Sequence, residues 1–322
     1  MKSSTGDAAR NALRKKTEEL ARHGHLPSEM TALVTAVAGL QLDALERARA
    51  CAAPDAEGAA GDAASAMRAA LAKAQSVPAD RHAQGEPLLA LRQFPIDTAL
   101  AAALAADVLR ALAEHAPSLA APAARMEERF AADPSLLEKA CRTLLEEAEQ
   151  SADGAKLSIF AEWAKEYPDA PDLLRFVVKS ALTPSVAACA ELAGARHDGK
   201  TVWAHGHCPV CGSLPYMGRL DGAEGTRLHT CSFCFFEYRV PRIGCPFCLV
   251  QAHDGSEYLE SEDEPGYLLD VCKECGRYIK LADFRKYDRA WFAALDDLAS
   301  LTLDLYARQM GYERPTPSAW GF

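Results

Sequence analysis

The sequence predicts an α+β protein of several domains, with a mostly α-helical N-terminal domain, two small four-cysteine metal modules and a C-terminal helix. Three observations support this. Ala/Leu-rich segments at helical spacing fill residues 1 to about 200. Paired cysteines then crowd into residues 208–275, and helical spacing returns after residue 285. We therefore predict domains at residues 1–200, 201–243, 244–285 and 286–322.

Residues with known preferences for helix ends divide the N-terminal region. A helical segment stops at Gly24, and Pro27 suits the first turn of the next. Asp133, followed by Pro134, is a good N-cap for the helix after it. Pro184 lies inside an apolar segment at 171–194, where we expect it to kink or split the helix. Cys51, Cys141 and Cys189, isolated on apolar faces, are predicted to be small buried hydrophobic residues.

The cysteine pairs carry the clearest chemical signal. All eight remaining cysteines occur as Cys-x-x-Cys, with nineteen, ten and twenty-three residues between successive pairs. This spacing brings two thiolates to one ion, and two such pairs make a tetrahedral site. The predicted metal ligands are Cys208, Cys211, Cys231, Cys234, Cys245, Cys248, Cys272 and Cys275.

Spacing favours sequential pairing, in which the first two pairs share one ion and the last two share another. Each site then closes after a β-hairpin, with one turn expected within residues 218–227. An interleaved arrangement, in which the second pair joins the third, stays sterically possible because ten residues suffice for a hairpin. Four thiolates suit zinc or iron, and an iron–sulfur cluster is also conceivable, so spacing does not choose the metal.

Other polar residues near the cysteines are predicted to have ordinary roles. With eight thiols for two ions, no histidine is required as a ligand. The acidic stretch at 254–270 is expected to be a solvated loop rather than a docking surface. The histidines near the cysteines that we therefore do not expect to bind metal are His205, His207, His229 and His253.

After residue 285 the pattern predicts one amphipathic helix. One face carries Trp291, Leu295, Leu298, Leu301 or Thr302, and Leu305, and Gly311 is a suitable stop. The tail that follows shows no periodicity.

Charge and composition exclude several classes of protein. A formal net charge of -10 argues against a nucleic-acid partner. The polar N-terminus shows no export signal, and the most apolar segment, 173–194, is interrupted by Lys179 and Pro184, so we expect a cytoplasmic protein without a membrane span. No phosphate loop, dinucleotide fingerprint or nucleophile–base set is recognisable, so we expect no catalytic activity.

Three segments, "HCPVCGSLP", "RLHTCSFCFFEYRVPRIGCPFC" and "CKECGRYIK", followed by "LDDLASLTLDLYARQMGY", resemble the FdhE family of formate dehydrogenase accessory proteins. The resemblance covers about residues 203–312, with Tyr238 where the family pattern has tryptophan. It implies a helical domain with two rubredoxin-like modules that bind iron, zinc being the alternative. It also implies a non-catalytic maturation factor that binds the catalytic subunit of formate dehydrogenase in the cytoplasm.

Two other functions stay open at this point. A zinc ribbon that binds nucleic acid has the same cysteine spacing, although the acidic chain opposes it. A rubredoxin-like electron-transfer protein also has paired cysteines in turns. The oligomeric state is left open as well.

Overall fold

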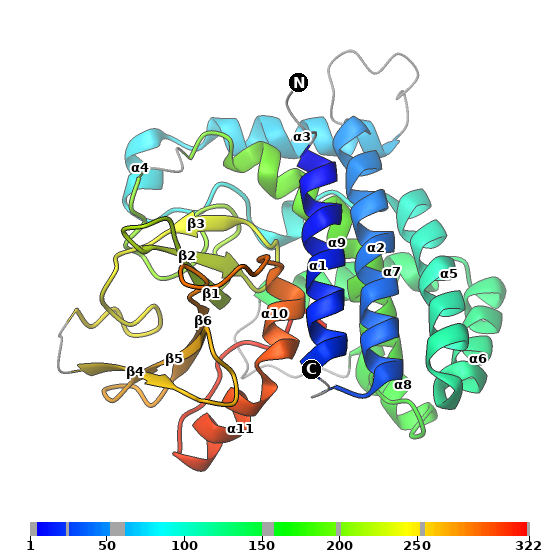
Figure 1. Ribbon diagram of the computed structural model, residues 1–322. Helices are drawn as coiled ribbons and strands as arrows, with labels where there is room; N and C mark the ends of the chain where they lie inside the picture. Colours follow the sequence, from blue (N-terminus) through cyan, green and yellow to red (C-terminus); the bar gives the residue numbers. More distant parts are fainter. Residues whose placement is uncertain are drawn as a thin grey trace.

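A computed structural model describes residues 5–23, 26–51, 62–149, 158–197, 201–251 and 255–320. Helices fill the N-terminal part, and a six-stranded sheet with two short helices forms the C-terminal part (Figure 1). This is the predicted fold class. The helices of the first part are α1 (Thr5–His23), α2 (Ser28–Cys51), α3 (Asp62–Ser76), α4 (Ala79–Ala83), α5 (Thr98–His115), α6 (Ala120–Ala132), α7 (Leu136–Glu149), α8 (Ile159–Glu166) and α9 (Leu173–Gly194).

Helix α9 is the centre of the helical part, where α2, α5 and α7 pack against it. By length and composition alone it could cross a membrane, but 78% of its apolar window is buried inside the protein. That burial fits a core helix, which is hydrophobic on all sides.

Pro184 lies inside α9 without splitting it, so of the two predicted effects the split is wrong, and the kink stays a prediction. A proline has no N–H to donate to the carbonyl four residues earlier, which here belongs to Ser180. The side-chain amide of Gln41, on α2, donates to that Ser180 oxygen at 3.1 Å. The neighbouring helix thus replaces the hydrogen bond that proline removes.

The sheet combines two three-stranded ribbons. The first ribbon contains β1 (Pro215–Asp221), β2 (Thr226–Cys231) and β3 (Glu237–Arg239), and the second contains β4 (Ser256–Glu260), β5 (Tyr267–Cys272) and β6 (Tyr278–Ala282). Pairing within each ribbon is antiparallel, and the first hairpin turns within the predicted residues 218–227. The two ribbons join where β1 pairs with β6 in parallel, from Met217 opposite Lys280 to Arg219 opposite Ala282. The domain limits at residues 200, 243 and 285 stay predictions.

The C-terminal segment forms two helices, α10 (Ala293–Ala299) and α11 (Leu301–Gln309), rather than the one helix predicted. The break lies at Ser300, whose hydroxyl donates to the carbonyl of Asp296 at 2.8 Å. The ammonium of Lys280, on β6, donates to the carbonyls of Asp297 and Ser300 at 2.7 and 3.3 Å. These carbonyls therefore have partners outside the helix, which stabilises the interruption.

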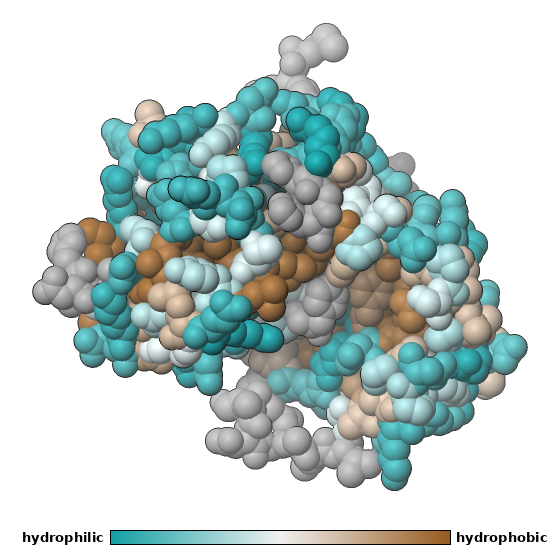
Figure 2. Space-filling view, turned by 60° about the horizontal axis from the view of Figure 1, so that its bottom comes forward, coloured by the Kyte–Doolittle hydropathy of each residue, from teal (hydrophilic) through white to brown (hydrophobic). Residues whose placement is uncertain are grey.

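Ionic contacts attach α1 and the C-terminal tail to α10, which itself contacts β1. Lys16, on α1, lies 2.7 Å from a carboxylate oxygen of Asp296, which also accepts a hydrogen bond from Tyr267 at 2.6 Å. In the C-terminal tail, Arg314 pairs with Asp297 at 2.7 Å, and Trp320 is buried. On the face shown in Figure 2, hydrophobic residues form a band between hydrophilic regions.

Candidate metal centres

The four Cys-x-x-Cys pairs have a common backbone turn. After the second cysteine of each pair the chain takes a positive φ, with values of 79° at Gly212, 59° at Phe235, 62° at Leu249 and 67° at Gly276. Glycine adopts this conformation without strain, but a side chain there costs on the order of 1–2 kcal/mol. Two of the four turns therefore hold a strained residue where the other two hold glycine.

Backbone hydrogen bonds fix each turn. The first cysteine of every pair donates its N–H to the carbonyl five residues later, as Cys208 does to Ser213 at 2.8 Å and Cys272 does to Arg277 at 2.8 Å. The amides of Val210, Phe233 and Phe247 lie 3.4 Å from the sulfur of the first cysteine in their turns. These N–H groups point at sulfur and stabilise negative charge on a thiolate.

The first cluster joins the first two pairs. Its four sulfur atoms all lie within 4.8 Å of one another, with Cys208–Cys234 at 3.6 Å and Cys211–Cys231 at 3.4 Å. All four cysteines are buried. The β1–β2 hairpin brings these pairs together, because one pair precedes β1 and the other begins at Cys231, the last residue of β2.

The second cluster joins the last two pairs across the second ribbon. Cys245 and Cys275 have their sulfur atoms 3.7 Å apart, as do Cys248 and Cys272. This cluster is less enclosed than the first, since Cys248 is exposed and Cys275 is half-buried. The structure thus brings all eight predicted ligands into two groups and confirms the sequential pairing, whereas the interleaved pairing is wrong.

The sulfur geometry fits a tetrahedral ion. A metal–sulfur bond of about 2.3 Å gives an edge of about 3.8 Å between sulfurs of a tetrahedron. The sulfur contacts of 3.4–3.7 Å are close to that edge and far from the roughly 2.05 Å of a disulfide. Both clusters can therefore hold one ion each in a closed four-thiolate site.

The thiols do not share one protonation state without a metal. Burial raises the pKa of Cys208 and Cys234 well above the ordinary value. Burial acts in the same direction on Cys211, but hydrogen bonds from neighbouring thiols hold its pKa well below the ordinary value. In the second cluster, hydrogen bonds from Val250 and Cys272 similarly outweigh burial and lower the pKa of Cys248. A divalent ion would remove the remaining protons, as metals do with coordinating thiols.

The described histidines lie outside both sulfur clusters, as expected. His205 and His207 contact backbone carbonyls of Ala83 and Gly85 at 3.0 and 2.8 Å, beside α4. His229 is buried and accepts a hydrogen bond from Arg227 at 3.0 Å. Burial and the Arg227 charge lower its pKa well below the ordinary value. His253 lies outside the described residues.

The isolated cysteines behave largely as predicted. Cys141 and Cys189 are buried in the helical core, and Cys51 is half-buried. Burial raises the pKa of Cys141 and of Cys189 to about 12, so both thiols stay protonated and apolar at neutral pH.

The acidic stretch is more ordered than the solvated loop that we expected. Within it, β4 and β5 form a hairpin, and Asp270 is buried and paired with Arg227. Glu264, in the turn, is also buried and accepts hydrogen bonds from Thr302 of α11. The hydrophobic residues on either side of Asp270 are the signal that predicts a strand here.

Comparisons with known proteins agree with this organisation. A model of the FdhE central domain matches residues 207–242, and a model of the FdhE C-terminal domain matches residues 245–320. One four-cysteine cluster lies within each matched segment.

Individual relatives and one solved structure agree with this organisation. The chain is 30% identical to Protein FdhE of Salmonella dublin over 237 residues, which is 73% of this chain and 69% of that protein. It is 32% identical to the Protein FdhE homolog of Aquifex aeolicus over 154 residues, covering 47% of this chain and about half (53%) of that protein. The crystal structure of the FdhE protein from Pseudomonas aeruginosa has the same fold, with a TM-score of 0.62 at 23% identity over 97% of this chain and 96% of that one. The chain belongs to the FdhE family.

Proposed function

We propose that this chain is a non-catalytic accessory protein of formate dehydrogenase that holds two metal ions. The observation that carries this proposal is the pair of closed four-thiol clusters, one in each segment that matches an FdhE family model. The eight cysteines would supply all ligands, so each ion would have no open position for substrate or water. Such ions contribute folding energy to small ribbons that have little hydrophobic core of their own.

Iron is the metal that the family resemblance implies, and zinc is the alternative with the same ligand chemistry. Metal analysis of anaerobically purified protein tests this part. Two iron or zinc ions per chain are expected. One ion per chain, or acid-labile sulfide from a bridged cluster, would contradict two mononuclear sites.

The partner in this proposal is the catalytic subunit of formate dehydrogenase, bound in the cytoplasm before that enzyme is complete. Deletion of the gene is expected to abolish formate dehydrogenase activity while the transcript of the enzyme stays at its normal level. Normal activity in the deletion strain would refute the role. Cell fractionation checks the cytoplasmic location.

Direct binding is tested by purifying a tagged copy of this chain from cells that make the catalytic subunit. Recovery of that subunit with the intact chain is expected. A tagged unrelated zinc-ribbon protein is the control for nonspecific capture. Recovery of the subunit with both proteins in equal amounts would count against a specific complex.

One observation favours a second candidate, electron transfer. Cys248 exposes a ligand of the second cluster to solvent, where electrons can pass to a docked partner. If iron in that cluster serves this purpose, the protein will show a reversible redox couple and will reduce or oxidise the catalytic subunit. An accessory role without electron transfer predicts that replacement of iron by zinc preserves activity in cells.

A further inference from the structure

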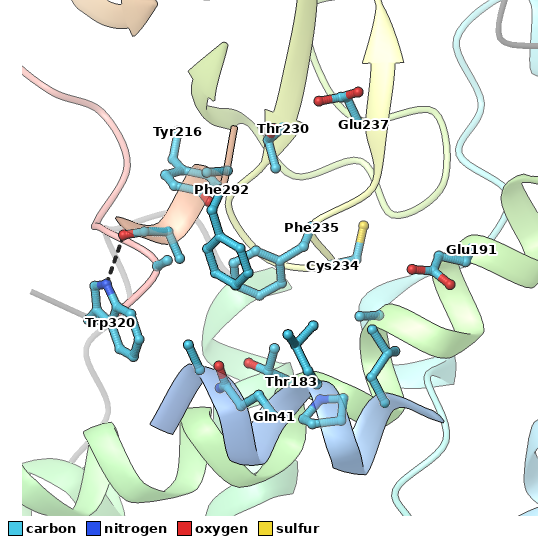
Figure 3. A pocket seen from close by; sticks show the side chains of 18 of the residues that line it. Gln41, Thr183, Glu191, Tyr216, Thr230, Cys234, Phe235, Glu237, Phe292 and Trp320 are labelled. Atoms are coloured by element: carbon cyan, nitrogen blue, oxygen red, sulfur yellow. Dashed lines mark hydrogen bonds between the residues drawn. The ribbon is translucent and has the colours of Figure 1, made fainter. Parts of the chain in front are cut away.

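A pocket of about 240 Å³ lies where the helical part, the first ribbon and the C-terminal segment meet. Figure 3 shows it between the second cysteine turn and the helices that carry Gln41 and Thr183. For comparison, an apolar cavity of about 150 Å³ is large enough for benzene. The main apolar walls of the pocket in this protein are Leu42 and Leu45 of α2, Pro184 of α9, and Phe235, Phe292 and Trp320.

The pocket suits an uncharged ligand, because the charges on its wall already have partners. Glu237 accepts two hydrogen bonds from Arg219 at 2.8 Å and one from the indole of Trp291 at 3.1 Å. Glu191 accepts two hydrogen bonds from Arg49 at 2.7 Å. An anion here would meet two carboxylates, and a cation would compete with arginines.

Two buried hydroxyl groups border the same pocket without a hydrogen-bond partner among the described residues. They belong to Tyr216 and Thr230, which are 1% and 4% exposed. A buried hydroxyl without a partner costs on the order of 1–3 kcal/mol, so such groups call for a ligand or water to satisfy them. Neither oxygen is exposed, so a ligand reaches these hydroxyls only when the aromatic side chains beside them, such as Phe235 or Phe292, move.

The pocket also touches the first cluster directly. Cys234, a member of that cluster, lines the pocket, and the next residue, Phe235, supplies an aromatic wall (Figure 3). Phe235 has the strained φ of 59° at the position where Gly212 and Gly276 stand in their own turns. Strained residues of this kind concentrate at functional sites, where the surrounding structure holds them. A ligand that moves the Phe235 ring must act on the turn that orients the Cys234 sulfur.

We propose that this pocket binds an uncharged aromatic group with one hydrogen-bonding atom, and that Phe235 transmits its occupancy to the first metal centre. The group is either a free aromatic molecule or an aromatic side chain of a polypeptide. Binding itself does not depend on the formate dehydrogenase role, whereas the transmission rests on the metal loading proposed above.

Calorimetric titration of the intact protein tests binding, with three probes. Indole represents the free molecule, N-acetyl-tryptophanamide represents a side chain on a backbone, and indole-3-acetate is the charged control. Saturable binding of either neutral probe is expected, with indole-3-acetate at least about tenfold weaker because its carboxylate lies among acidic groups. Whichever neutral probe binds more tightly identifies the source. Absence of saturable binding by both neutral probes would overturn the proposal.

Variants locate the bound probe. Ala187→Leu places a larger side chain in the pocket from α9 and is expected to abolish binding. The double variant Tyr216→Phe with Thr230→Val removes only the two hydroxyls and is expected to weaken binding about tenfold, which is the effect of losing a hydrogen bond or two. Unchanged affinity in Ala187→Leu would place the probe elsewhere and refute the assignment.

Cadmium-113 NMR tests the transmission. Protein loaded with ¹¹³Cd is expected to give two resonances, and the Cys272→Ser variant assigns the second centre by its loss. The bound probe should shift only the resonance of the first centre. Phe235→Gly also removes one wall of the pocket, so it is measured at a probe concentration that calorimetry shows to saturate the variant. Under that condition it should remove the shift while both resonances persist. Leu249→Gly relieves the same strain in the third turn, away from the pocket, and should leave the shift intact. Binding that shifts neither resonance would refute transmission through Phe235.

Discussion

Arg227 and Asp270 form a buried ion pair between the two ribbons of the sheet, with Nη2 and Oδ2 2.5 Å apart. Their side chains are only 1% and 3% exposed. Arg227 lies on β2 of the first ribbon, and Asp270 lies on β5 of the second. The guanidinium also donates to the carbonyl of Gly244, in the segment between the two clusters. This one side chain therefore contacts both ribbons and their connection.

The first prediction concerns this pair. Asp270→Ala leaves the Arg227 charge buried without its partner, so we expect the free energy of unfolding to fall by about 3–5 kcal/mol. Urea denaturation of the metal-loaded protein measures the change. Glu257→Ala is the matched control, because Glu257 pairs with Lys273 on the exposed side of the same hairpin. An exposed pair contributes about 1 kcal/mol or less. Equal losses from the two variants would contradict the role of burial.

The second prediction concerns the grouping of the ligands. Cys231→Ser is expected to lose the metal of the first cluster and keep the second, and Cys245→Ser is expected to do the reverse. Native mass spectrometry counts the ions in each variant, and the wild type should carry two. If both variants lost the same single metal, the eight cysteines would not form two independent sites.

The third prediction concerns metal release. The first cluster is buried and the second exposes Cys248, so a chelator has direct access to only one of them. We expect biphasic release, with the second centre losing its ion at least about tenfold faster, since release from the first requires local opening. Stopped-flow measurement with a chromogenic chelator follows the phases. The Cys245→Ser variant, which keeps only the first centre, should lack the fast phase; a single rate for both centres would refute the asymmetry.

The fourth prediction concerns pH. Burial lowers the pKa of Lys179 from 10.5 to about 8, and its ammonium donates to the carbonyl of Ser318 at 2.8 Å. Between these two pH values the unfolded chain holds a proton that the folded protein does not, so the contribution of Lys179 to stability rises with pH. Relative to Lys179→Met, the wild type should gain up to about 3 kcal/mol from pH 8 to 10.5.

Urea denaturation across that pH range measures this difference. Lys165→Met, at an exposed position of α8, is the control and should show no comparable change. A constant difference between the wild type and Lys179→Met would mean that Lys179 is charged in the folded protein throughout.

Features that depend on local spacing could be predicted from the sequence. The grouping of the cysteines follows from pair spacing, and the first hairpin follows from the glycines near its turn. The strained turns at Phe235 and Leu249 could not be predicted in this way, because no glycine marks them. Their conformation belongs to the turn itself, which the amides of Cys231 and Cys245 close by donating to the carbonyls of Phe236 and Val250.

Features that depend on distant residues were missed. The pattern around Ser300 is helical, but Lys280, twenty residues earlier, binds the carbonyls that an unbroken helix would use. The sequence predicts a solvated loop at Asp270, because the residue that pairs with it, Arg227, lies forty-three residues away. Gln41 similarly supports the helix that Pro184 is predicted to kink or split. In each case a side chain from another element supplies the hydrogen bond or ion pair that a polar group would otherwise lack. The sequence close to that group does not show this partner.

The parallel pairing of β1 with β6 has a consequence for synthesis of the chain. On the ribosome, β1 can pair with β2 as soon as residue 231 emerges, but its other edge has no partner until residues 278–282 follow. An open strand edge is a site for pairing with other chains. The free edge of β1 is therefore exposed to aggregation while about fifty further residues are synthesised. It is covered only when β6 of the second ribbon pairs with it.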